Sequence, residues 1–127
     1  MSNTSTNTNY DNPEAKSYPT EIYHVATAED WDAWFEQETY QPAAFEREGF
    51  IHCCTEEQLP GVLERYFRGK TGLKKLYIDA KRLHAPLKWE IAASTGEYFP
   101  HVYGPINRSA IVGMKVLPKQ PDPPSTT

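Results

Sequence analysis

The stretch Gly49-Phe50-Ile51-His52-Cys53-Cys54-Thr55-Glu56-Glu57-Gln58 joins an apolar run that carries one imidazole to a helix-capping signal. Thr55 and Gln58 have the spacing of a capping box, in which the hydroxyl of Thr55 accepts from the amide of Gln58 and the Gln58 side chain accepts from the amide of Thr55. We therefore predict a short buried strand over 50–54 that turns directly into a helix, with the imidazole of His52 buried near the junction. Free backbone N–H groups at such a junction are suited to binding a ligand.

The composition predicts one soluble domain of the cytoplasm. The chain has 127 residues, and its 13 Lys and Arg against 17 Asp and Glu give a net charge of −4, which provides no basic face for nucleic acid. No apolar run approaches the roughly 18 residues that a membrane-spanning helix needs. A disulfide between the neighbours Cys53 and Cys54 would be strained, so a reducing compartment is expected.

The ends of the chain differ from its middle. Residues 1–20 are rich in Ser, Thr and Asn, and residues 118–127 are rich in Pro, so both are predicted to be disordered tails. The single folded domain is then expected over residues 21–117.

Helices are predicted early in this domain. A strand over 22–26 precedes Thr27, which caps a helix over 28–37 with Trp31, Trp34 and Phe35 on one face. A short helical connector over 43–48 is closed by Gly49. The helix after the capping box has apolar residues at helical spacing from 59 to 67, with a 3₁₀-like first turn because Pro60 opens the regular helix.

Strands are predicted late. Alternating or β-branched patterns indicate strands over 73–79, 87–91, 98–103 and 110–117, with a tight turn or short helical turn over 104–107. Early helices and late strands favour an α+β fold over a parallel, doubly wound sheet.

Several segments together resemble one known family. They are Ile22-Tyr23-His24, Gly49-Phe50-Ile51-His52-Cys53, Leu76-Tyr77-Ile78-Asp79, Leu87-Lys88-Trp89-Glu90 and Phe99-Pro100-His101-Val102-Tyr103-Gly104-Pro105-Ile106-Asn107. On these segments the chain is identified as a member of the family called domain of unknown function 952. The resemblance covers most of residues 22–117.

This family resembles the ADP-ribosyltransferases, which implies a split, largely antiparallel sheet that holds a nucleotide in a cleft. Tyr23-His24 followed by Thr27 is similar to a first-strand signature that holds the adenosine ribose of NAD. His52 falls on the second His of a motif in the RNA 2′-phosphotransferases. The resemblance also implies a late Glu that stabilises an oxocarbenium-like transition state, for which Glu90 and Glu97 are available. It therefore implies an NAD-like or ADP-ribose-like ligand, with NAD as the candidate cofactor.

The candidate catalytic residues are His52, His101 and Glu90, and the candidate ligand-binding residues are His24, Thr27, His52, Thr55, His101 and Tyr103. An imidazole can orient a ligand or act as acid or base near neutral pH, and a carboxylate can help it. Each residue also has a structural interpretation. His24 fits a core histidine, Thr55 a helix cap, His101 and Tyr103 a packed aromatic strand, and Glu90 a solvated charge.

Other functions remain as alternatives. In a non-catalytic protein-interaction module the histidines would be structural, and exposed aromatics such as Tyr40 or Tyr98 would meet a partner. A metal site could use His24, His52, Cys54 and His101, but the chain lacks zinc-ligand spacing, so no metal is predicted. Cys54 is interpreted first as an inert cysteine, and a nucleophilic role is the alternative. The cations Arg65, Arg68, Lys70, Lys74 and Lys75 are read as a solvated face, and no oligomeric state is favoured.

Overall fold

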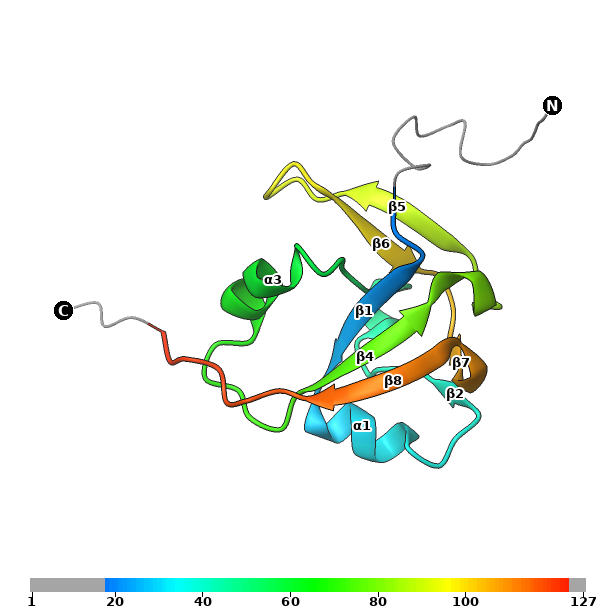
Figure 1. Ribbon diagram of the computed structural model, residues 1–127, viewed down its shortest axis with the longest axis horizontal. Coiled ribbons are helices and arrows are strands. Elements are labelled where there is room, and N and C mark those ends of the chain that lie inside the picture. Colours follow the sequence, from blue (N-terminus) through cyan, green and yellow to red (C-terminus); the bar gives the residue numbers. More distant parts are fainter. Residues whose placement is uncertain (1–17, 124–127) are drawn as a thin grey trace.

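Three antiparallel sheets form the described part of the chain, residues 18–123 of the computed structural model (Figure 1). The strands are β1 (Glu21–Ala26), β2 (Thr39–Tyr40), β3 (Ile51–His52), β4 (Lys74–Asp79), β5 (Leu87–Ile91), β6 (Tyr98–Val102), β7 (Ile106–Asn107) and β8 (Ile111–Val116). The helices are α1 (Ala28–Trp34), α2 (Phe45–Glu48) and α3 (Leu59–Tyr66), with 3₁₀ turns η3 (Ala80–Arg82) and η4 (Arg108–Ala110). All α-helices precede most of the strands, so the predicted α+β fold with antiparallel strands is confirmed.

The two larger sheets meet at one point. Their strand orders are β1-β4-β8 and β3-β6-β5. Tyr23 of β1 and Cys54, just after β3, exchange two backbone hydrogen bonds of 2.8 Å each. This isolated bridge joins the sheets without merging them, because β1 makes its regular ladder with β4 and β3 makes its ladder with β6.

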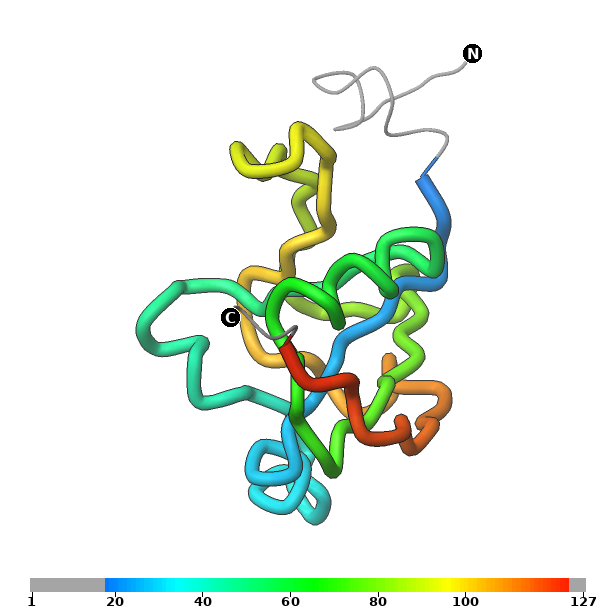
Figure 2. Tube along the Cα trace, turned by 90° about the vertical axis from the view of Figure 1, so that its left-hand side faces the viewer, coloured from blue at the N-terminus to red at the C-terminus, as the bar shows by residue number. Residues whose placement is uncertain are grey.

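Strand β1 is covered on both faces of the β1-β4-β8 sheet, since its alternate side chains pack into different clusters, whereas the edge strand β8 is largely exposed. Ile22 and Ala26 of β1 lie with Leu76 and Ile78 of β4 in a core that also contains Trp34 of α1. Tyr23 and Val25 of β1 belong to a second cluster, with Leu59 and its neighbours on α3. Helices α1 and α3 therefore lie apart, on either side of β1 and β4 (Figures 1 and 2).

Helix α1 begins as predicted and ends early. The hydroxyl of Thr27 accepts from the amide of Asp30 at 3.1 Å, which confirms the cap. The helix ends at Trp34, whereas the apolar spacing predicted residue 37. The guanidinium of Arg108 donates to the carbonyl oxygens of Phe35 at 3.1 Å and Gln37 at 2.9 Å. These contacts satisfy end carbonyls of α1 while the chain turns into β2.

The other two local predictions are also confirmed. Helix α2 forms the short connector, and Gly49 closes it with a φ of 83°, a left-handed conformation that glycine adopts without a steric penalty. In the capping box, Thr55 N donates to Gln58 Oε1 at 3.0 Å and Gln58 N donates to Thr55 Oγ1 at 3.2 Å. The regular helix α3 starts only at Leu59, with Pro60 in its first turn.

The turn predicted over residues 104–107 is wrong in its second half. Ile106–Asn107 forms β7, which pairs with β2 of Thr39–Tyr40. Neither strand has a sequence signal, since each is two residues long and depends on a partner far away in the chain.

Both ends of the predicted domain extend further than residues 21–117. The ring of Tyr18 stacks on Trp89 with centroids 3.8 Å apart. At the other end, Gln120 N donates to Lys70 O at 3.0 Å and Gly69 N donates to Pro121 O at 3.0 Å. We call residues 118–122 the C-terminal strap. The rest of the two predicted tails, residues 1–17 and 124–127, lies outside the described residues. No helix in the described part of the chain is long and apolar enough to cross a membrane.

Candidate functional site

A pocket of about 670 Å³ opens where the two larger sheets diverge. This volume is in the range of small-molecule sites, roughly 300–1,000 Å³. Strands β1, β3 and β6 line it together with parts of α1, α2 and α3. Three of its polar lining residues are histidines. The lining residues used below are Tyr23, His24, Thr27, Asp30, Arg47, Glu48, Phe50, His52, Cys54, Val62, Phe67, Phe99 and His101.

His52 lies at the rim of this pocket and is exposed, so the prediction of a buried imidazole is wrong. Successive residues of a strand face opposite ways, and β3 buries Ile51 in the core, which turns the His52 ring outward. Its side chain is 61% exposed, and its Nε2 lies 2.7 Å from Oε1 of Glu48 at the end of α2. A carboxylate oxygen accepts, so in the neutral ring the proton sits on Nε2 and Nδ1 keeps its lone pair.

His101 faces His52 from the next strand. The two are direct partners in the β3–β6 ladder, and their rings lie 5.3 Å apart, nearly perpendicular at 82°. The His101 ring is buried and stacks on Phe50 with centroids 4.1 Å apart. Its Nδ1 donates to Oε1 of Glu90 at 2.7 Å, which leaves the Nε2 lone pair free in the neutral ring.

The carboxylate of Glu90 accepts two hydrogen bonds. The hydroxyl of Tyr103 donates to Oε1 of Glu90 at 2.6 Å, beside the bond from His101. Burial opposes the charged carboxylate, but the hydrogen bonds from Tyr103 and His101 outweigh it and lower the pKa of Glu90. The antiparallel β5–β6 pair brings these residues together, since Lys88 is the direct partner of His101 and Glu90 is one diagonal step away on the same face. Glu90 is therefore an ionised, hydrogen-bonded carboxylate.

Burial lowers the pKa of His101 despite the opposing pull of Glu90, so the ring is neutral at pH 7. Among residues 18–123, no protein hydrogen bond is found for His101 Nε2 or for His52 Nδ1. The site thus presents two imidazoles, each held through one nitrogen by a carboxylate.

His24 has a different environment. Its Nδ1 donates to the carbonyl oxygen of His52 at 2.6 Å, and its Nε2 accepts from the hydroxyl of Tyr40 at 2.8 Å. Burial lowers its pKa to about 4. Both ring nitrogens are satisfied within the protein, which matches the core-histidine interpretation, although the ring lines the pocket. Tyr40 is fully buried, so the prediction that it is an exposed contact is wrong.

The remaining candidates are divided between the pocket and its surroundings. Thr27 lines the pocket, with its hydroxyl engaged in the cap of α1. Thr55 is not among the lining residues, and its hydroxyl is engaged by the capping box. Tyr103 and Glu90 lie behind His101 rather than on the pocket wall. The structure therefore brings His52, His101, Glu90 and Tyr103 into one network.

The cysteines are inert in this arrangement. Cys53 and Cys54 lie in different core clusters, as their opposite faces predict. Burial raises the pKa of Cys53 well above its usual value and that of Cys54 to about 12, which disfavours the thiolate that a nucleophile needs. Within residues 18–123, no group of three His, Cys, Asp or Glu residues is placed to hold a metal ion.

Sequence reasoning missed three site residues. Phe50 stacks on the ring of His101 and meets the ring of His52 edge-on, and Arg47 and Glu48 of α2 line the pocket. The contact between Glu48 and His52 had no local signal, because Glu48 ends α2 and His52 lies in β3 after the turn at Gly49. The contact of Phe50 with His101 had no such signal, because it depends on the pairing of β3 with β6.

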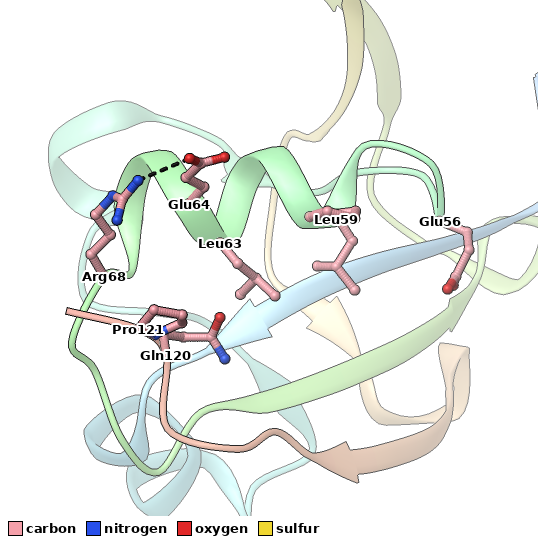
Figure 3. Close-up of a pocket in the computed structure, with 8 residues that line it drawn as sticks. Glu56, Leu59, Leu63, Glu64, Arg68, Gln120 and Pro121 are labelled. Atoms are coloured by element: carbon pink, nitrogen blue, oxygen red, sulfur yellow. Dashed lines mark hydrogen bonds and ion pairs between the residues drawn. The ribbon is translucent and has the colours of Figure 1, made fainter. Parts of the chain in front are cut away.

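A second groove lies between α3 and the C-terminal strap (Figure 3). Its volume is about 560 Å³, and Leu59 and Leu63 form its apolar wall. Its charged residues are already paired: Glu64 binds Arg68 at 2.9 Å and Glu56 binds Lys75 at 2.9 Å. Lys75 is buried, so its assignment to a solvated basic face is wrong.

The fold and the site define a small α+β protein with a histidine-lined pocket between two antiparallel sheets. The chain belongs to the family described as protein of unknown function DUF952, whose model matches residues 25–114. The crystal structure of protein CC0527 from Caulobacter crescentus is similar, with 33% identity and a TM-score of 0.69 over 76% of this chain and 85% of that chain. The solution NMR structure of CC0527 matches with 33% identity and a TM-score of 0.67, over 79% and 86% of the two chains. No curated protein matches the chain significantly.

Proposed function

We propose that the protein binds a nucleotide-type ligand, NAD-like or ADP-ribose-like, in the pocket between β1, β3 and β6. One observation carries the proposal: a pocket of about 670 Å³ that combines apolar side chains with the imidazoles of His52 and His101. Such a site suits a ligand with a flat ring and hydroxyl groups, since apolar and aromatic walls bind the ring and a few polar groups fix its orientation.

The distribution of the lining residues supports this ligand class. Phe50 and the two imidazoles provide aromatic surface next to free ring nitrogens. The exposed guanidinium of Arg47, 3.7 Å from Glu48, is the cation of the lining that can meet a phosphate at the rim. The sequence resemblance to ADP-ribosyltransferases, which rests on Tyr23-His24 and Thr27, and the resemblance of His52 to a motif of RNA 2′-phosphotransferases point to the same class. If the protein is an enzyme, transfer or hydrolysis at a ribose carbon is the chemistry this site suits.

Binding is tested by a thermal-shift screen of the purified full chain against NAD, ADP-ribose, adenine nucleotides and glutathione. A ligand at a hundred times its Kd stabilises the folded state by about 2.7 kcal/mol, which is a shift of several degrees for a domain of this size. We expect NAD or ADP-ribose to raise the Tm of the wild type, and His52→Ala to remove most of that shift.

The control is His84→Ala. His84 is exposed and does not line the pocket, so this variant should respond to the ligand as the wild type does. Both substitutions leave backbone groups intact, and the His52 carbonyl that accepts from His24 is retained in His52→Ala. No Tm shift with any nucleotide, or an equal shift in His52→Ala, would contradict the proposal.

A non-catalytic interaction module is the second candidate, and the state of His24 favours it. This histidine is structural, with both nitrogens bonded inside the protein, and Ile91 and Tyr98 at the β5–β6 hairpin are exposed apolar side chains. In that case no nucleotide would raise the Tm, and Tyr98→Ala would weaken association with a protein partner without changing the fold.

A further inference from the structure

We propose that Glu90 and His101 form a general-base dyad that activates water for cleavage of a ribosyl bond in the pocket ligand. This inference rests on the proposed nucleotide-type ligand and adds a reaction class and the role of each residue. The inference depends on the geometry of one hydrogen-bond network on β5 and β6. In this network Glu90 bonds His101, and His101 lines the pocket whereas Glu90 does not.

Glu90 fixes which nitrogen of His101 is basic. Its Oε1 accepts from Nδ1–H of His101 at 2.7 Å, so the lone pair of the neutral ring lies on Nε2. Phe50 stacks on the same ring at 4.1 Å and prevents it from rotating freely. Tyr103 donates to Oε1 of Glu90 at 2.6 Å and in turn restrains the carboxylate. A base with a fixed tautomer and a fixed ring plane is what general-base catalysis requires.

The charges around the pocket favour cleavage at a ribosyl carbon over phosphoryl transfer. Phosphoryl transfer is stabilised by cations around the phosphate oxygens. Here the lining holds one guanidinium, that of Arg47, against the carboxylates of Asp30 and Glu48, and Glu90 bonds His101 from outside the lining. A glycosidic bond breaks through a transition state with positive charge on the sugar, which nearby carboxylates stabilise.

The step balances as a hydrolysis. Nε2 of His101 takes a proton from water while the water oxygen bonds to the anomeric carbon of the ribose. The bond from that carbon to the ring nitrogen of the leaving group breaks, and the electron pair leaves with the ring. A pyridinium leaving group departs as a neutral ring and needs no proton. The proton on His101 then passes to solvent, so neither oxidant nor metal is consumed.

The test uses the full chain with NAD as the probe and measures both the Tm shift and the release of nicotinamide by chromatography. We expect the wild type to release nicotinamide, and His101→Gln to lower kcat by roughly 10²- to 10⁴-fold while it still gives a Tm shift with NAD. His84→Gln is the matched control and should retain the wild-type rate. Wild-type rates in His101→Gln would overturn the assignment of the base.

Glu90 is a positioning residue, and a pH profile separates this role from a structural one. Because Glu90 raises the pKa of His101, Glu90→Gln should lower that pKa and move the acid limb of the kcat/KM profile to lower pH, with a reduced plateau. Glu90→Asp should recover part of the plateau. Glu57→Gln, at an exposed position outside the pocket, should change neither. An unmoved acid limb in Glu90→Gln would overturn the dyad.

The two proposals fail in different ways. A Tm shift with NAD without nicotinamide release by the wild type overturns the hydrolysis and leaves the binding proposal standing. The absence of both overturns the binding proposal and the dyad together.

Discussion

His24 and His101 show how a single residue type takes different roles in the two larger sheets. Its ring is buried and neutral, with Nδ1–H directed at the His52 carbonyl and Nε2 bonded to Tyr40. His101 is also buried and neutral, but among residues 18–123 only its Nδ1 has a hydrogen-bond partner, the carboxylate of Glu90, and the residue lines the pocket. The number of nitrogens that the protein itself occupies, rather than burial, separates a structural histidine from a candidate base.

The buried state of His24 makes the stability of the protein depend on pH. Its folded pKa is about 4, below the usual 6.5, so between these values the unfolded chain binds a proton that the folded protein does not. The contribution of His24 to stability is therefore complete above pH 6.5 and is lost as the pH falls from 6.5 to 4. At about 1.4 kcal/mol per pKa unit, the loss is on the order of 3 kcal/mol.

Urea unfolding between pH 7 and pH 4.5, with NMR titration of the histidine rings, measures this dependence. We expect the His24 ring to remain neutral down to about pH 4, and the stability loss to be unchanged in His84→Gln, where an exposed histidine is removed. A His24 ring that titrates near its usual pKa in the folded protein would contradict the prediction.

At the scale of elements, the start of α3 is tied to the β5–β6 hairpin. Gln58 reaches back to the amide of Thr55 through Oε1, while its Nε2 donates to the carbonyl oxygen of Tyr98 at 2.9 Å. One side chain therefore caps the helix and connects it to the hairpin that carries Glu90 and His101. This connection fixes one wall of the pocket relative to the other.

Substitutions at the capping box should distinguish its two functions. Thr55→Ala should lower the free energy of unfolding by about 1 kcal/mol, because the amide of Gln58 loses its acceptor, and Thr55→Ser should restore most of it. Gln58→Glu keeps an acceptor for the Thr55 amide and removes the donor to Tyr98. We expect this variant to retain the helix and loosen the hairpin.

The measurements are urea unfolding for stability and amide hydrogen exchange for the hairpin. Faster exchange confined to residues 91–98 in Gln58→Glu is the expected result. Equal stability in Thr55→Ala and the wild type would show that the cap does not contribute.

At the scale of the whole molecule, the C-terminal strap holds the end of the chain against the turn after α3. Two backbone hydrogen bonds link it to Gly69 and Lys70, and Gln120 is buried with 8% of its surface exposed. Figure 3 shows the strap residues Gln120 and Pro121 facing Leu63 across the second groove. The strap is thus part of the fold and closes one side of that groove.

Truncation tests the strap. A chain that ends at Leu117 loses both backbone bonds, each of which contributes about 0.5–1.5 kcal/mol, so its free energy of unfolding should fall by roughly 1–3 kcal/mol. A chain that ends at Pro123 keeps the strap and should match the full chain. Equal urea midpoints for all three chains would show that the strap contributes nothing to stability.

The sequence by itself determined what depends on neighbours in the chain. Thr27, the capping box at Thr55 and the left-handed Gly49 were predicted correctly because each acts within a few residues. The residue pattern likewise predicted the strand over 73–79, whose Leu76 and Ile78 lie in the core, and the order of helices and strands indicated the α+β class. It also singled out His52, His101 and Tyr103 as polar rings on apolar strands, whereas Glu90 was named only through the family resemblance.

Only the tertiary structure decided how these residues meet. Strands β2 and β7 exist because they pair with each other, and each is too short for its own signal. The exposure of His52 follows from Ile51 occupying the core, and the bond between Glu90 and His101 follows from the register of β5 against β6. A shift of one residue in that register would turn each side chain to the other face, and registers are set by long-range packing. Local sequence therefore identified the candidate residues, and strand pairing determined which of them lie together in one site.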